Sequence, residues 1–329
     1  MAERASAPAG ISPPRALHRC AVAVAVATFI LIFVGGLVTS TGSALSVPDW
    51  PLAFGHLIPK LIGGVRFEWS HRLVAGIVSI LTLILALWMC FVERRRWLCN
   101  LALAAFALVI VQAVLGGITV LYGLPLPIAV AHAVTGQTFF CVVVALAIFT
   151  SPEFVARPHM KTDYARPSLP VLATITTAVI YLQIIIGALM RHLGAGLAIP
   201  DFPFAFGHLI PPHFDEFIAI NFAHRCGAVV VTIFVIWTAA RVLHYFSGEA
   251  RLRRRAIGLL VLLIVQITLG ALTVLSQRAV IPTTAHVAIG AAVLATSLSL
   301  AIRAWALTGL ASARLQAKVP TPLTQAVAR

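Results

Sequence analysis

The stretch PDWPLAFGHLIP at residues 48–59 has a near copy, PDFPFAFGHLIP, at residues 200–211. The copies differ only where Trp50 becomes Phe202 and Leu52 becomes Phe204. Unrelated hydrophobic loops do not share a sequence of this length by chance. The repeat therefore predicts that the chain is built from two copies of one structural unit.

Composition places this repeat in a membrane. Hydrophobic residues make up 60% of the 329 residues and charged residues only 10%, which is too little polar surface to cover a soluble globule. Near-continuous apolar runs are each long enough to cross about 30 Å of hydrocarbon as a helix. These eight runs lie at 17–39, 71–92, 98–121, 128–150, 168–190, 218–243, 256–275 and 283–307. We predict an all-α integral membrane protein with eight transmembrane helices.

The similarity between the halves extends well beyond the loops. QAVLGGITVL at 112–121 matches QITLGALTVL at 266–275, and AHAVTG at 131–136 matches AHVAIG at 285–290. Each copy has an even number of helices, so both copies cross the membrane in the same direction, as parallel repeats. Short connections favour two up-down four-helix bundles. The predicted order is a tail at 1–16, an N-terminal bundle at 17–150, a linker at 151–167, a C-terminal bundle at 168–307 and a tail at 308–329.

The distribution of basic residues predicts the orientation. With both termini in the cytoplasm, the inner segments hold 18 of the 24 Lys and Arg residues, as the positive-inside rule requires. The net charge of +14 follows from this bias, because basic loops face anionic lipid head groups. We therefore expect the lipid bilayer as a partner and no nucleic acid. Both repeated loops then lie outside.

Four of the eleven histidines recur near the outer ends of the even-numbered helices: His71, His132, His224 and His286. In an up-down bundle the second and fourth helices are diagonal neighbours, so His71 can face His132 and His224 can face His286. Two facing imidazoles can ligate one haem iron axially. The pattern therefore predicts one haem-iron site in each bundle.

Two glycines and two alternatives bear on this prediction. Gly136 and Gly290 follow His132 and His286 by one helical turn, and we expect them to leave room for a flat macrocycle.

A transmembrane histidine is otherwise more often a hydrogen-bonded or proton-relay residue, as in a transporter built on parallel repeats. A transporter would have broken helices at the midplane, whereas these histidines lie near the outer face. A different metal would need Asp or Cys ligands at matched spacing.

Charged residues accompany the histidines. Arg72 and Arg225 directly follow a histidine at the outer boundary, where a guanidinium can pair with a haem propionate or with a lipid head group. His56 and His208 recur within the loops, where packing or capping is their ordinary role, so we rank them below the four helical histidines.

One charge distinguishes the halves. Glu68 stands three residues before His71, whereas Asn221 stands three residues before His224. Residues three apart share a helix face, so Glu68 is predicted to face the same haem as His71. A carboxylate within a membrane is costly, and its presence in one half favours a role in proton transfer. The alternative is a structural hydrogen bond to an outer loop.

The fragments TGSALSVPDWP, EWSHRL, AHAVTG, AHRCG and AHVAIG, in this order, resemble the haem A synthase family. These membrane enzymes oxidise haem O to haem A for cytochrome oxidase assembly. The resemblance covers residues 17–307 and implies two four-helix bundles in a pseudo-twofold relation. One bundle would hold a haem B cofactor and the other the substrate. Some bacterial members carry a cysteine pair in the outer loops, which this chain lacks.

The resemblance also implies residue roles. His71 and His132 would serve the N-terminal haem site, His224 and His286 the C-terminal one, and Glu68 the chemistry. Because Glu68 occurs only in the N-terminal bundle, we expect haem O to bind there and haem B to bind in the C-terminal bundle. The reaction would convert the C8 methyl of haem O to a formyl group by successive hydroxylations.

The same resemblance implies a setting. The chain would lie in the inner (plasma) membrane of the cell. It would receive haem O from haem O synthase (protohaem farnesyltransferase) and electrons from an electron donor. A homo-oligomer is compatible with the sequence. The alternative function is a di-haem b-type electron-transfer cytochrome without bond chemistry. That alternative accounts for the four histidines but not for the difference between Glu68 and Asn221.

Overall fold

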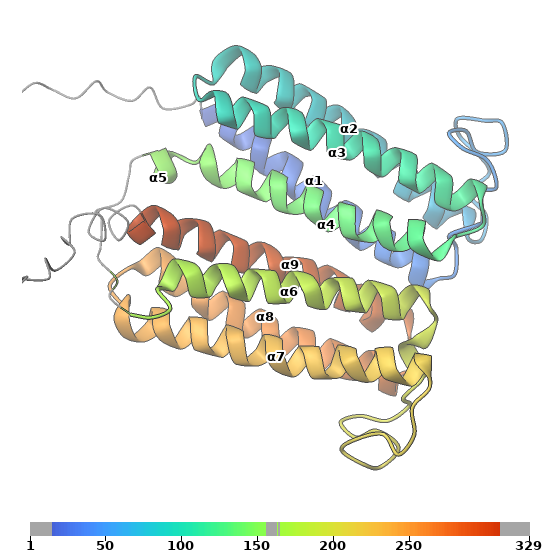
Figure 1. The fold of residues 1–329 in the computed structure, drawn as a ribbon. Coiled ribbons are helices and arrows are strands. Elements are labelled where there is room, and N and C mark those ends of the chain that lie inside the picture. Colours follow the sequence, from blue (N-terminus) through green and yellow to red (C-terminus); the bar gives the residue numbers. More distant parts are fainter. Residues whose placement is uncertain (1–14, 156–162, 164, 310–329) are drawn as a thin grey trace, which may run out of the picture.

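The computed structural model describes residues 15–155, 163 and 165–309, and every regular element in that part of the chain is a helix (Figure 1). The predicted tails at 1–16 and 308–329 lie almost wholly outside the described residues, as does most of the linker at 151–167. The N-terminal half contains α1 (Arg15–Ser40), α2 (Val65–Val92), α3 (Arg96–Leu121) and α4 (Leu126–Phe149). After the short α5 (Pro152–Val155), the C-terminal half contains α6 (Leu169–His192), α7 (Glu216–Tyr245), α8 (Ala250–Leu275) and α9 (Val280–Ala304), which a π-helical turn extends over Trp305–Gly309.

The eight long helices are the predicted membrane spans. Each is long and apolar enough to cross a bilayer, by length and composition. The protein is therefore a multi-pass helical membrane protein, as predicted. The apolar run predicted α2 to begin near residue 71, but the helix begins at Val65. Its first turns carry Glu68, which binds the preceding loop. Because these turns contain polar residues, hydropathy alone does not identify them as part of the helix.

The helices of each half pack in a ring. In the N-terminal half α1 contacts α2 and α4, and α3 contacts α2 and α4. In the C-terminal half α6 contacts α7 and α9, and α8 contacts α7 and α9. The diagonal pairs are thus α2 with α4 and α7 with α9, and the halves meet where α9 packs on α1 and α4 and where α6 packs on α4 (Figure 1). This packing fits the predicted pair of four-helix bundles.

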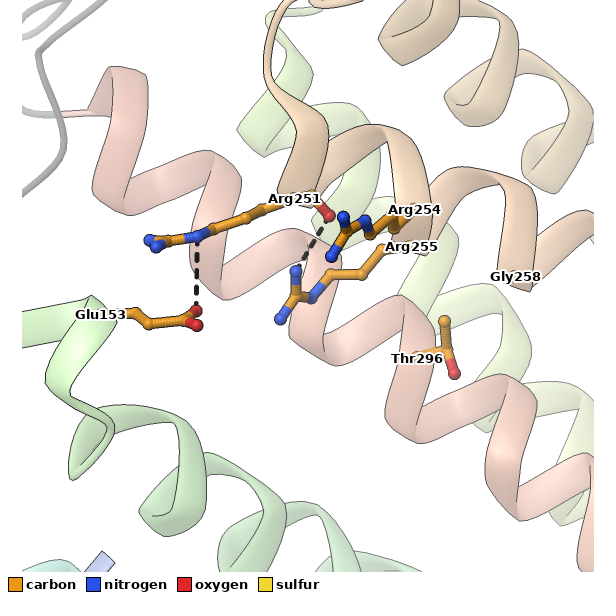
Figure 2. A pocket seen from close by; sticks show the side chains of 6 residues that line it. All are labelled: Glu153, Arg251, Arg254, Arg255, Gly258 and Thr296. Atoms are coloured by element: carbon orange, nitrogen blue, oxygen red, sulfur yellow. Dashed lines mark hydrogen bonds and ion pairs between the residues drawn. The ribbon is translucent and has the colours of Figure 1, made fainter. Parts of the chain in front are cut away.

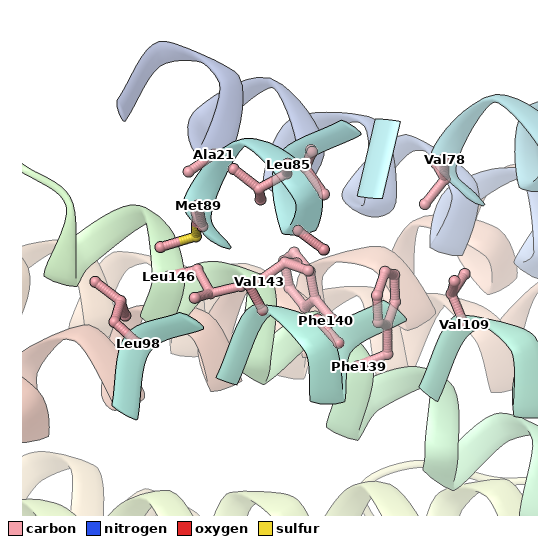
Figure 3. Packing of buried hydrophobic residues seen from close by; sticks show 14 of the residues in the cluster. Ala21, Val78, Leu85, Met89, Leu98, Val109, Phe139, Phe140, Val143 and Leu146 are labelled. Atoms are coloured by element: carbon pink, nitrogen blue, oxygen red, sulfur yellow. The ribbon is translucent and has the colours of Figure 1, made fainter. Parts of the chain in front are cut away.

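The apolar core of the N-terminal half extends from one end of the bundle to its middle, and His71 and His132 lie toward the other end. We call the end that carries the loops 41–64 and 193–215 the loop end, and the opposite end, where α5 lies, the α5 end (Figure 1). Figure 3 shows the core of the N-terminal half, in which Met89, Leu98, Phe140 and Leu146 meet between α2, α3 and α4. Met89, Leu98 and Leu146 belong to the last turns of α2 and α4 and the first turn of α3, which lie at the α5 end, whereas Phe140 lies near the middle of α4. Close van der Waals packing at this end stabilises the association of the helices, because in a lipid bilayer the hydrophobic effect contributes little to it.

The two repeated loops have the same conformation. The side chain of Asp49 accepts hydrogen bonds from the N–H groups of Gly55 (2.8 Å) and Phe54 (2.7 Å). Asp201 does the same for Gly207 and Phe206, both at 2.8 Å. These donors hold the pKa of each carboxyl below its ordinary value. Loop 41–64 holds no helix, and loop 193–215 holds only a 3-10 turn at Ala195–Leu197.

Candidate functional site

The four helical histidines lie on the diagonal helices, near the loop end. His71 lies in α2, His132 in α4, His224 in α7 and His286 in α9. They occupy the second or third helical turn and not the first, because the helices begin earlier than the apolar runs. The ring centres of His224 and His286 are 6.4 Å apart, with an angle of 72° between the ring planes. Two metal–nitrogen bonds of about 2 Å each, plus a ring radius on either side, give a centre-to-centre distance of this size.

Each of these histidines packs against a glycine of the preceding helix. A Cβ built on that glycine would come within 2.9–3.2 Å of the histidine Cε1, closer than side chains normally approach. The four pairs are Gly35 with His71, Gly116 with His132, Gly187 with His224 and Gly270 with His286. A side chain at any of these positions would push the ring by a few tenths of an ångström or more. Sequence reasoning missed these glycines, although all of them recur at matched positions in the repeat.

The two glycines that the sequence did single out have different neighbours. A Cβ on Gly136 would lie 3.3 Å from Gln112 Nε2, and a Cβ on Gly290 would lie 3.1 Å from Gln266 Nε2. In the structure these glycines make room for glutamine side chains.

Glutamines surround three of the four histidines. Gln112 Nε2 donates to the backbone carbonyl of His132 (2.8 Å), and Gln183 Nε2 donates to that of His224 (2.7 Å) and lies 3.0 Å from His224 Nδ1. His286 Nδ1 lies 3.1 Å from the backbone carbonyl of Gln266, in position to donate to it. Each glutamine precedes the histidine-packing glycine by four residues, so a recurring Q-x-x-x-G pattern was a usable signal in the sequence. The matching position in α1 is Leu31.

The imidazoles of the N-terminal half are less constrained. His71 Nδ1 and His132 Nδ1 are buried, and neither has a hydrogen-bond partner among the described residues. A buried polar nitrogen without a partner is costly, so such an atom points to a group that the bare chain lacks. The described residues also contain no cluster of three or more His, Cys, Asp or Glu side chains that could hold a metal ion. Paired imidazoles backed by glycine fit a haem group.

Glu68 anchors the first loop to α2. Its side chain is buried, with Oε2 accepting from the Val47 N–H (2.9 Å) and Oε1 accepting from Arg72 (2.6 Å). Arg72 also donates to the backbone carbonyls of Asp49 (2.7 Å), Leu52 (2.9 Å) and Val47 (3.1 Å). The structure therefore contains the hydrogen bond to an outer loop that was the alternative interpretation of Glu68. Its proton-transfer role and the contact of Arg72 with a propionate stay predictions.

Asn221 and Arg225 form the equivalent anchor in the second half. Asn221 Nδ2 donates to the carbonyls of Ala195 (2.8 Å) and Gly196 (3.3 Å), while its Oδ1 accepts from Arg225 Nε (3.0 Å). Arg225 also donates to the carbonyls of Phe204 (2.8 Å) and Ile199 (2.9 Å). Both arginines thus hold their loops against the helices, and the propionate contact predicted for Arg225 also stays a prediction.

The loop histidines do not join the buried pairs. His56 and His208 are exposed, and each lies in the short backbone pairing of its loop, with Ala53 and Ala205 respectively. The structure gives them no buried partner that would suggest a ligand role.

A multi-pass membrane protein in which two half-buried imidazoles, those of His224 and His286, lie 6.4 Å apart across diagonal helices belongs to the class that can hold haem between its spans. The comparison with known proteins agrees. The chain belongs to the COX15-CtaA family of cytochrome oxidase assembly proteins, whose model matches residues 18–62 and 65–298.

Individual relatives cover most of the chain. It is 30% identical over 268 residues to the haem A synthase of Symbiobacterium thermophilum, which covers 78% of this chain and 85% of the relative. It is 30% identical over 279 residues to the haem A synthase of Geobacillus kaustophilus, with 80% and 83% covered. It is 31% identical over 261 residues to the haem A synthase of Listeria monocytogenes, with 74% and 81% covered.

Proposed function

We propose that this protein is a haem A synthase, a membrane oxidoreductase that converts the C8 methyl of haem O to the formyl group of haem A. The observation that carries the proposal is the set of four half-buried histidines on diagonal helices, each packed on a glycine, in a chain of this family. Bound haem supplies the redox chemistry. The protein's own residues hold the reacting group, exclude water and handle protons.

The two halves are assigned different roles within this proposal. The C-terminal half binds haem B between His224 and His286, because the surrounding glutamines already hold these rings. A metal-ligating histidine normally donates a hydrogen bond from its second ring nitrogen, as His286 Nδ1 does to the carbonyl of Gln266. At His224 the Gln183 amide instead donates to Nδ1 and holds the ring in place. The N-terminal half binds haem O, with His71 and His132 as its ligands. Rings without such partners suit a group that must enter and leave.

Glu68 is the proposed proton acceptor beside the substrate. It lies in α2, one turn before His71, and is only 3% exposed. Its bond to Arg72 holds the carboxylate in place. Arg72 and Arg225 are proposed to contact propionates at the loop end while they hold the loops.

The setting completes the proposal. The protein lies in the plasma membrane with both termini in the cytoplasm, so the loop end faces outward. Haem O arrives from haem O synthase, and a separate donor supplies electrons.

The test uses a host that makes haem O but lacks its own haem A synthase. Expression of the full chain is expected to produce haem A, measured by extracting haems and separating haem B, haem O, the alcohol intermediate and haem A by chromatography. Purified protein should show the visible spectrum of a low-spin, bis-histidine haem. His208→Ala, a change at an exposed loop histidine, is the matched control and should retain both signals. Haem-free protein that produces no haem A would overturn the proposal.

A further inference from the structure

At the α5 end, far from the histidines, an open cavity of about 410 Å³ lies where the two halves meet. Glu153 of α5 forms one side, and the first turns of α8 and a late turn of α9 form the other (Figure 2). The lining residues are Glu153, Arg251, Arg254, Arg255, Gly258 and Thr296. Nothing in the proposed haem chemistry uses this cavity.

Cations outnumber anions around it. A single oxygen of Glu153, Oε2, is shared by Arg251 Nε (3.4 Å) and Arg303 NH2 (3.2 Å). Arg255 is held by the Ser299 hydroxyl (2.7 Å) and by the backbone carbonyl of Arg251 (2.9 Å). Among the described residues, three guanidinium groups and one carboxylate line the cavity, and Arg303 binds that carboxylate from outside the lining. Like charges this close repel one another unless an anion lies between them.

One of these cations also has an unused donor. The Arg303 side chain is only 12% exposed, and its Nε is buried without a hydrogen-bond partner among the described residues. Arg303 does not line the cavity, so it acts there through its charge and its bond to Glu153.

The other half of the repeat lacks this cavity chemistry. Helices α3 and α8 correspond residue for residue, as do α4 and α9, with a numbering shift of 154 from Arg96 to Ala250. The residues that match the four arginines are uncharged: Trp97 for Arg251, Asn100 for Arg254, Leu101 for Arg255 and Phe149 for Arg303. Trp97 and Phe149 pack edge to face, with ring centres 5.0 Å apart.

General charge bias does not account for this difference. The N-terminal half meets the positive-inside rule with Arg94, Arg95 and Arg96 at the start of α3, where Arg95 pairs with Glu93 (2.8 Å). Its basic residues thus lie outside the position that corresponds to the cavity. The C-terminal half instead gathers its arginines around one space.

We infer that this cavity binds a phosphate-bearing anion, either the head group of an anionic phospholipid or a free phosphate compound. Guanidinium groups bind phosphate oxygens through paired N–H donors, and several of them around one space match that chemistry. The cavity also lies at an end of the transmembrane helices, where basic pockets meet lipid head groups. Glu153 holds two of the arginines in place and leaves the rest of their charge for the ligand.

The test measures binding to the purified full chain. In detergent, the thermal unfolding midpoint is followed during titration with phosphatidylglycerol, with zwitterionic phosphatidylcholine and with sodium pyrophosphate. Stabilisation by phosphatidylglycerol alone identifies a lipid site, and stabilisation by pyrophosphate identifies a site open to soluble phosphates. Phosphatidylcholine is expected to have no effect at the same concentrations. No stabilisation by either anion would overturn the inference.

Variants link the effect to the cavity. Loss of one guanidinium contact is expected to lower affinity about tenfold, so Arg251→Gln/Arg254→Gln should lower it about a hundredfold. Arg254→Gln alone removes no hydrogen bond seen among the described residues and is the fallback if the double variant does not fold. Arg94→Gln/Arg96→Gln removes the same charge at the same end, outside the cavity, and should bind like the unaltered protein. Equal affinities for the cavity variants and this control would also overturn the inference.

Discussion

The two halves hold their histidines in different ways, although they descend from one repeated unit. In the C-terminal half, Gln183 lies against the ring of His224, and the backbone of Gln266 faces Nδ1 of His286. In the N-terminal half, Leu31 replaces the first of these glutamines, and Nδ1 of His71 has no partner among the described residues. A histidine side chain whose orientation is already fixed favours binding of a permanent cofactor, because less conformational entropy of that side chain is lost when the cofactor binds. This difference supports a cofactor site in the C-terminal half and a substrate site in the N-terminal half.

The loop anchors make a second comparison between the halves. Glu68 accepts a hydrogen bond from a loop N–H, whereas Asn221 donates to loop carbonyls, yet both also bind the arginine four residues later. The repeated loop therefore keeps its conformation with or without a carboxylate at this position. Only the N-terminal half therefore has a carboxylate at this position, where it could also serve chemistry.

The largest expected effect comes from replacing the histidines, which tests whether the two halves bind different haems. His224→Ala or His286→Ala should abolish the low-spin haem spectrum, because each removes one of the two proposed axial ligands. His71→Ala should leave that spectrum in place and stop haem A formation. Visible spectra of purified protein and chromatography of extracted haems check both. A full low-spin signal in the double His224→Ala/His286→Ala variant would contradict the assignment.

A smaller loss is expected at Glu68. Glu68→Gln keeps the size of the side chain but removes the proposed proton acceptor, so conversion of haem O should fall about a hundredfold and stall at haem O or the alcohol intermediate. The C-terminal haem spectrum should stay normal. The conversion rate should also lose part of its pH dependence, which a purely structural role would not predict.

Asn221→Ala is the matched change in the other half. It removes the loop contacts without touching the proposed substrate site, so it should reduce conversion far less than Glu68→Gln. A larger loss from Asn221→Ala would mean that the roles of the halves are exchanged.

An exchange of residues between α1 and α6 sharpens the comparison further. Gln183→Leu gives the C-terminal half the residue of α1, and the loss of the hydrogen bond to His224 should weaken haem retention about 10- to 100-fold. The reciprocal Leu31→Gln should slow turnover of the N-terminal site by holding His71. Haem release to an apo-acceptor protein measures the first effect, and multiple-turnover conversion measures the second. Equal haem retention in Gln183→Leu and unaltered protein would argue against orientation by the glutamine.

The smallest effect should be the same in both halves. Hydrogen bonds from Gly55 and Phe54 hold the pKa of Asp49 below its ordinary value of about 4. The folded state therefore binds fewer protons than the unfolded state, so this stabilisation is present above about pH 4 and is lost as the pH falls further. Asp49→Asn and Asp201→Asn should each slightly reduce the acid sensitivity of the thermal unfolding midpoint between pH 6 and pH 3. Both aspartates are partly exposed, so solvent screening keeps the change small. A marked difference between the two variants would show that the loops are not equivalent.

The main features of the fold could be read from the residues. Hydropathy located all eight spans, because a bilayer imposes a minimum apolar length on any helix that crosses it. The repeat predicted that the halves correspond, and the loops indeed share their conformation down to the bonds of Asp49 and Asp201. The helix starts were less predictable, because the first turns of α2 bind a loop and carry polar residues.

The candidate site was predictable only in part. The sequence by itself determined the spans, the two-copy organisation and the histidines on alternate helices, since these follow from apolar length, self-similarity and the parity of the helices. Only the tertiary structure decided that Gly35 and Gly187 touch histidines, that Glu68 and Arg72 hold a loop, and that arginines of α8 and α9 meet Glu153. Those contacts depend on how each helix is rotated about its axis against its neighbours. That rotation is set by close packing of side chains from several helices at once, which no single stretch of sequence contains.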